Sequence, residues 1–187
     1  MRKIIAGWLA GIWLCLLLVR LPVQAANLAE PIQAQAYVLM EQESGTVLAE
    51  AQADVPLPMG MMAKLMTVLL AAEQLESGAW TLETMLTASD VVNTCEGATV
   101  WLTAGETMTV ADLLKAVIIG NANDAAAVLA ESVSGSVPAF VMEMNARAFD
   151  LGMHQTIFTN PQGYDDEKQC TTARDLAKLC QRLAEYE

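Results

Sequence analysis

The sequence predicts a helix-rich α/β fold that begins with a β-hairpin. Two short apolar runs, 37–40 and 47–49, are separated by a polar stretch whose Ser44-Gly45 suits a turn, and this pattern is typical of a hairpin. From Met61 to Leu75, apolar residues recur at helical spacing with no Gly or Pro, which predicts a largely buried helix. The rest of the chain favours helices over strands.

Four later helices are expected, and each follows a residue able to cap it. The expected helices cover 110–119, 123–130, 137–151 and a last stretch that begins at 173 and still runs at Glu187. Their caps are, in the same order, Thr109, Asn123, Ser136 and Thr172. Asp124 falls in the first turn of the second of these helices, where the helix dipole favours a carboxylate. A hairpin alone is marginally stable in water, so we expect further strands, which this sequence does not contain, to complete the sheet.

The first 25 residues have the features of a secretory signal peptide. Arg2 and Lys3 precede an apolar run over 4–19, and small residues lead up to Ala25. A retained membrane anchor, which would allow peripheral membrane association, is the alternative, although the run is shorter than the roughly 20 apolar residues that span a bilayer. Residues 26–187 then form a single exported domain.

Composition excludes some classes of protein. The formal net charge of −12 argues against nucleic acid as a partner, because phosphate binding relies on clustered Lys and Arg. The acidic residues are interpreted as a solvated surface. Cys95, Cys170 and Cys180 permit one disulfide in an exported protein, but the sequence does not select the pair. Their spacing matches no metal site, and no metal or cofactor is implied.

The segment from Pro58 to Thr67 contains a motif that bears on catalysis. It is similar to the segment carrying the active-site Ser-x-x-Lys of the penicillin-binding serine D-alanyl-D-alanine carboxypeptidases, peptidase family S11. Lys64 matches the general-base lysine, and Met61 stands at the position of the nucleophilic serine. Residues three apart share one helix face, so a hydroxyl there could pass its proton to the amine. A thioether has no proton to lose.

A second motif lies in Ile119 to Ala125, which resembles the Ser-x-Asn of the same family followed by Asp-Ala. Asn123 matches the substrate-binding asparagine, whereas Asn121 replaces the serine that helps to move a proton to the leaving amine. An amide side chain does not titrate usefully, so proton transfer by Asn121 is not expected. Both residues could instead serve only as turn and cap residues.

The resemblance covers nearly all of the mature chain. It includes the stretches 36–48, 102–114, 140–152 and 158–163. It implies a serine β-lactamase/DD-peptidase-like fold with a sheet of five mainly antiparallel strands, of which only the first two are expected here. The third family element, Lys-Thr-Gly on a later strand, occurs nowhere in the sequence and would follow Glu187. Residues 26–187 are therefore predicted to be a partial catalytic domain of incomplete fold.

The function that the resemblance implies is removal of the terminal D-alanine from peptidoglycan stem peptides through an acyl-enzyme, in the cell envelope. This copy is expected to be inactive or severely impaired, because Met61, Asn121 and the lack of Lys-Thr-Gly remove three elements of the site. β-Lactams would bind covalently only if another nucleophile exists. The alternatives are a non-catalytic envelope protein that binds stem peptides or a partner through Lys64 and Asn123, and a fragment that does not fold stably.

Simpler interpretations exist for several of these residues. Without the resemblance, Lys64 would be an amphipathic lysine whose amine reaches water. Met61, like the other methionines, is a core-filling residue, and it is expected to fill the pocket of the serine that it replaces. Thr67, on the same face but one turn deeper than Lys64, is not expected to act as a nucleophile. His154 is expected to be a solvated loop residue.

Overall fold

The computed structural model describes residues 32–186, and the predicted signal peptide lies outside this range. Contacts divide the chain into two units, Met1–Gln33 and Ala34–Glu187. The fold and the candidate site described below belong to the second unit.

The predicted hairpin is confirmed. Strands β1 (Tyr37–Met40) and β2 (Val47–Ala51) pair antiparallel, with Tyr37 opposite Ala51. The turn is closed by Glu41, whose carboxylate accepts hydrogen bonds from the backbone N–H and the hydroxyl of Ser44. Gly45 follows with a φ of 67°, a conformation that glycine adopts without strain.

The five predicted helices are present, with two corrections. They are α2 (Ala63–Glu76), α3 (Val110–Ile118), α4 (Asn123–Ser134), α5 (Val137–Asp150) and α6 (Ala173–Leu183). The expected caps of α3, α5 and α6 each accept a backbone N–H with a side-chain oxygen. The prediction that the last helix still runs at Glu187 is wrong, because α6 ends at Leu183. The first residues of the predicted 61–75 helix form a separate 3₁₀ turn, η1 (Gly60–Met62).

Two short ladders and a 3₁₀ segment were not predicted. Strand β3 (Leu57–Pro58) pairs with β6 (Cys170–Thr171), and β4 (Met85–Thr87) pairs with β5 (Thr107–Thr109). The 3₁₀ segment η2 (Asp90–Thr94) lies between β4 and β5 in the chain. Strands of two or three residues are too short to show an alternating pattern in sequence. The β3–β6 ladder places the chain before η1 next to the chain before α6.

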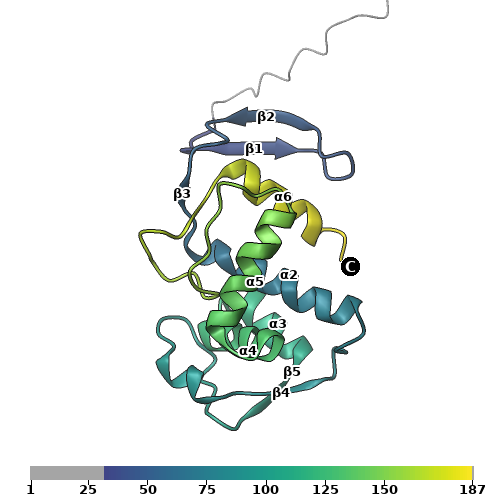
Figure 1. The fold of residues 1–187 in the computed structure, drawn as a ribbon, viewed down its shortest axis with the longest axis vertical. Helices are drawn as coiled ribbons and strands as arrows, with labels where there is room; N and C mark the ends of the chain where they lie inside the picture. The colour runs from purple at the N-terminus through teal and green to yellow at the C-terminus, as the bar shows by residue number, and fades with distance from the viewer. Residues whose placement is uncertain (1–31, 187) are drawn as a thin grey trace, which may run out of the picture. The chain divides into compact units, whose positions relative to one another are not determined.

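Helix α2 lies between two apolar clusters, which explains why its sequence is apolar on more than one face. One cluster joins α2 to α5 and α6 and includes Met66, Phe140 and Leu179. The other joins α2 to α3 and α4 and includes Ala71 and Leu113. Figure 1 shows α2 running through the middle of the helices, with α6 between them and the hairpin. The buried helix predicted from the apolar spacing is thus confirmed.

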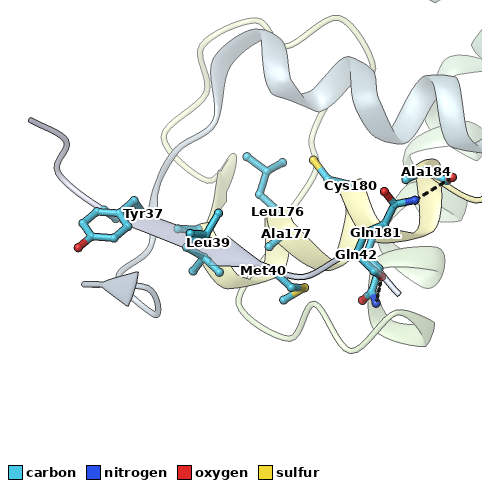
Figure 2. Close-up of a pocket in the computed structure, with 12 residues that line it drawn as sticks. Tyr37, Leu39, Met40, Gln42, Leu176, Ala177, Cys180, Gln181 and Ala184 are labelled. Carbon is cyan, nitrogen blue, oxygen red and sulfur yellow. Dashed lines mark hydrogen bonds between the residues drawn. The ribbon is translucent and has the colours of Figure 1, made fainter. Parts of the chain in front are cut away.

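An apolar groove of about 560 Å³ separates β1 from α6 (Figure 2). Five consecutive residues, Ala36 to Met40, line it, and since successive side chains of a strand point to opposite faces, the groove opens on the edge of β1. The other edge of β1 pairs with β2. Among the described residues no strand pairs with the groove edge. On α6, the lining residues follow a single stripe that includes Leu176 and Cys180.

Two further observations concern the cysteines and the possibility of a membrane span. Cys95, Cys170 and Cys180 are all free in the described structure. By length and composition, no single helix of the described residues could cross a membrane, and only α4 and α5, bent by 81° relative to each other, meet that test as a pair.

Candidate functional site

Met61 and Lys64 lie at the start of α2 in very different surroundings. Met61 belongs to η1 and is 63% exposed, whereas Lys64, in the first turn of α2, is only 6% exposed. The expectation that Met61 fills the space of a missing serine is therefore wrong, because its side chain points largely into solvent. The alternative in which the amine of Lys64 reaches water is also wrong. The buried amine of Lys64 thus lies three residues after the exposed thioether of Met61.

The amine of Lys64 has one hydrogen-bond partner, the main-chain carbonyl oxygen of Gln162, at 2.5 Å. Burial lowers the pKa of Lys64 from 10.5 to about 8. At pH 7 about a tenth of the amines would then be neutral, compared with about one in 3,000 for an ordinary lysine. This fraction makes Lys64 suited to accept a proton near neutral pH.

Thr67 lies one turn deeper than Lys64, as expected. It is fully buried, and its hydroxyl donates to the main-chain carbonyl of Pro161 at 3.0 Å. Its oxygen is therefore closed off from solvent by the segment that also contacts Lys64. This geometry agrees with the expectation that Thr67 does not replace the missing nucleophile.

Asn121 and Asn123 occupy the turn between α3 and the start of α4. Asn121 is partly exposed and has a φ of 53°, in the left-handed region that asparagine tolerates better than most residues. Asn123 is 7% exposed, and its side-chain N–H donates to the carbonyl of Glu96 at 2.6 Å. Its prediction as a helix cap is wrong, because Ala122 holds the cap position and no side chain caps this helix.

The amide oxygen of Asn123 is a buried acceptor without a partner. Within the described residues it is the one side-chain nitrogen or oxygen that is buried and makes no hydrogen bond. An unsatisfied buried acceptor costs about 1–3 kcal/mol, so native proteins seldom keep one without a reason. A donor from a ligand could reach this oxygen only if the groups that cover it moved.

The segment 95–102 is held against the start of α4 by Asp124. This carboxylate is almost fully buried and accepts the backbone N–H groups of Val100 and Leu102, at 3.1 and 3.0 Å to its Oδ2 atom. Trp101, between them, has a φ of 57° and is 85% exposed. A bulky residue in this conformation is strained, and the two hydrogen bonds on either side hold it there.

Lys64 and Asn123 are connected through the loop 159–164. Lys64 reaches it at the carbonyl of Gln162, and Asn123 reaches it through Glu96, whose carbonyl and N–H both bind the hydroxyl of Tyr164. Gln162 lies in a stretch that resembles the family, but the sequence indicated no role for it, and nothing in the sequence pointed to Tyr164. A main-chain carbonyl leaves no trace in the pattern of side chains, so no sequence signal marked the first contact.

Other potential reactive groups contribute little to this site. Cys95 is the thiol next to Asn123, with its sulfur 3.7 Å from the Asn123 carbonyl oxygen. Burial raises the pKa of Cys95, which keeps it protonated and weakly nucleophilic at neutral pH. His154 is exposed and stacks at a tilt on Phe149, as a solvated loop residue would. The described residues contain no group of three or more His, Cys, Asp or Glu side chains able to hold a metal ion.

The arrangement of the helices is that of the DD-peptidase-like fold of penicillin-binding proteins. Penicillin-binding protein 5 of Haemophilus influenzae matches the structure with a TM-score of 0.79 and 33% identity, over 83% of this chain and 46% of that protein. Penicillin-binding protein 6B of Escherichia coli matches with a TM-score of 0.80 and 26% identity, over 84% of this chain and 52% of that protein. The predicted fold class is confirmed.

Residues 23–187 match the profile of the peptidase S11 family, described as D-alanyl-D-alanine carboxypeptidase. The chain belongs to this family. D-alanyl-D-alanine carboxypeptidase DacF of Bacillus subtilis is 36% identical over 155 residues, and DacC of Escherichia coli is 38% identical over 161 residues. Each match covers 83% of this chain and 40% of the relative, so the chain spans less than half the length of these two relatives.

Proposed function

We propose that this chain is an envelope-located member of the D-alanyl-D-alanine carboxypeptidase family that retains the lysine environment of the active site but lacks its nucleophile. Its relatives DacF and DacC are D-alanyl-D-alanine carboxypeptidases. The substrate proposed for the site is the D-alanyl-D-alanine end of a peptidoglycan stem peptide. The leader over residues 1–25 would export the domain formed by 26–187.

The observation that carries this proposal is the contrast between Lys64 and Met61. Lys64 is buried, its pKa is lowered to about 8, and it is fixed by one hydrogen bond, which suits a general base. Met61, three residues earlier and largely exposed, offers a thioether where such a base would activate a hydroxyl. Loss of the nucleophile from a comparable serine hydrolase lowers turnover by about 10⁶-fold.

Release of D-alanine from a synthetic stem pentapeptide tests this proposal. The unmodified chain is expected to release D-alanine no faster than a Lys64→Ala variant does. Release at a rate well above that variant would overturn the proposal, because it would require a nucleophile other than residue 61. The same assay on Met61→Ser shows whether the nucleophile is the one element that the site needs.

A second candidate function is binding of stem peptides without turnover. It is favoured by the unpartnered amide oxygen of Asn123, which is buried and would accept a hydrogen bond from a peptide N–H once binding displaced the groups that cover it. Asn121, also in this turn, has no titratable group and would at most position the peptide. Titration of the chain with the pentapeptide, compared with Asn123→Leu, tests this function, and equal affinity of the two proteins would exclude it.

A further inference from the structure

Loop 159–164 is attached to the start of α2 at two main-chain carbonyls. Gln162 accepts from the Lys64 amine at 2.5 Å, and Pro161 accepts from the Thr67 hydroxyl at 3.0 Å. Gly163 packs so closely that a Cβ atom on it would lie 2.3 Å from the carbonyl oxygen of Gly60. The position of the Lys64 amine therefore depends on where this loop places its backbone.

The loop contains no helix or strand, so its shape must come from other hydrogen bonds. The side-chain oxygen of Asn160 accepts the backbone N–H groups of Gly163 and Tyr164, at 2.7 and 2.9 Å. Its side-chain nitrogen donates to the carbonyl of Tyr164 at 3.1 Å. One amide thus closes the turn that presents the Gln162 carbonyl.

A second amide holds the two ends of the loop together. Gln169 is 3% exposed, and its side-chain oxygen accepts the N–H groups of Thr159 and Asn160, at 3.0 and 3.2 Å. Its side-chain nitrogen donates to the carbonyl of Tyr164 at 3.0 Å. Gln169 directly precedes β6, whose pairing with β3 anchors it beside the chain that enters η1.

The structure assigns Asn160 and Gln169 as positioning residues for Lys64, because their side-chain amides fix loop 159–164 so that the Gln162 carbonyl holds the amine of Lys64. This inference rests on the proposed function in so far as Lys64 is the base of the site. Neither residue touches the amine, and both act through the loop. The hydrogen bond to Gln162 uses one N–H of a neutral amine and leaves its lone pair free to accept a proton.

Competitive acetylation of the purified chain with trace acetic anhydride, from pH 6 to 11, tests this assignment. Peptide mass spectrometry gives the pH midpoint of each lysine, and Lys115, which is exposed, serves as an internal standard. In Asn160→Ala and Gln169→Ala, the Lys64 midpoint is expected to rise by at least one pH unit, since water reaches the amine once the loop moves. The Lys115 midpoint should not change, and neither should the midpoints in Asn93→Ala, which alters an exposed asparagine outside the loop whose side chain bonds only to Asp90.

An unchanged Lys64 midpoint in folded Asn160→Ala and Gln169→Ala would overturn the assignment. If either alanine variant does not fold, Asn160→Ser is measured in its place. Its hydroxyl is too short to accept from both Gly163 and Tyr164, so a smaller rise is expected, and no rise would again overturn the assignment. The two tests are separate. D-alanine release by the unmodified chain would contradict the proposed function, whereas the Lys64 midpoint tests only the assignment of Asn160 and Gln169.

Discussion

Gly163 lies directly against Gly60, at the point where the loop before β6 meets the turn before α2. A Cβ atom on Gly163 would come within 2.3 Å of the Gly60 carbonyl oxygen and 2.8 Å of the Met61 Cα atom, and the φ of Gly163 is +84°. The close approach of two main-chain segments thus brings residue 61 and the Gln162 carbonyl to the same place.

Substitution of Gly163 should be much more costly than substitution of another glycine of similar conformation. Gly163→Ala adds overpacking of about 2 kcal/mol to the cost of a left-handed alanine, about 1–2 kcal/mol. Gly105→Ala, at a φ of +86° with no atom within 4 Å of the added Cβ, has the second cost alone. Urea denaturation of the two variants gives both values, and equal destabilisation would contradict the close packing.

Lys64 should make stability depend on pH in the alkaline range. Its pKa is lowered in the folded state, so the unfolded chain binds more protons between pH 8 and 10.5, and stability contributed by this residue rises with pH across that window. Relative to Lys64→Met, the native chain should gain about 3 kcal/mol from pH 8 to 10.5 and change little below pH 8. Denaturation curves of both proteins at each pH measure the difference between their free energies of unfolding. A difference that does not vary with pH would show that folding does not lower the pKa of Lys64.

Much of the secondary structure could be predicted from the sequence because it depends on local features. Thr109, Ser136 and Thr172 cap helices through hydrogen bonds to residues three positions on, which a sequence pattern records directly. Asn123 looked like a fourth cap, but its amide binds Glu96, 27 residues earlier in the chain. The same residue types cap helices and form hydrogen bonds to distant loops, so the sequence pattern alone does not distinguish the two roles.

The sequence predicted which side chains belong to the candidate site, but not their surroundings. Lys64, Met61 and Asn123 were identified from motif spacing, and their assignment to family positions stays a prediction. The burial of Lys64 depends on loop 159–164, which is about 100 residues away in sequence, and its bonding partner is a backbone carbonyl. The exposure of Met61 could not be predicted either, because an apolar residue in a helical pattern is normally assigned to the core.

Asp124 should be a strong determinant of stability although it lies at a helix start, where acids are often exposed. Asp124→Ala leaves the backbone N–H groups of Val100 and Leu102 without their acceptor, and a loss of about 3 kcal/mol is expected. Asp112→Ala, which removes an exposed acid from the first turn of α3, should have a much smaller effect. Thermal melts of both variants measure this, and similar melting temperatures would contradict the role of Asp124.

The two phenylalanines of α5 offer a test of the core. Phe140 is fully buried in the cluster between α2, α5 and α6, so Phe140→Ala should lower the free energy of unfolding by about 3–5 kcal/mol. Phe149 is 70% exposed, and Phe149→Ala should change it by no more than about 0.5 kcal/mol. Guanidinium denaturation distinguishes them. A broad, non-cooperative transition of the unmodified chain would instead show that the described residues do not form a stable core.

The most direct measurement is labelling of the purified chain, without residues 1–25, by a fluorescent penicillin, alongside Met61→Ser, with both read on a denaturing gel. Because residue 61 offers no nucleophile while the lysine environment is retained, no covalent band is expected from the unmodified chain, and a band is expected from Met61→Ser. A covalent band from the unmodified chain would contradict the proposed loss of the nucleophile. The absence of a band from a folded Met61→Ser variant would contradict the claim that a serine beside Lys64 restores the site, and would point to Asn121 and the missing Lys-Thr-Gly as further losses.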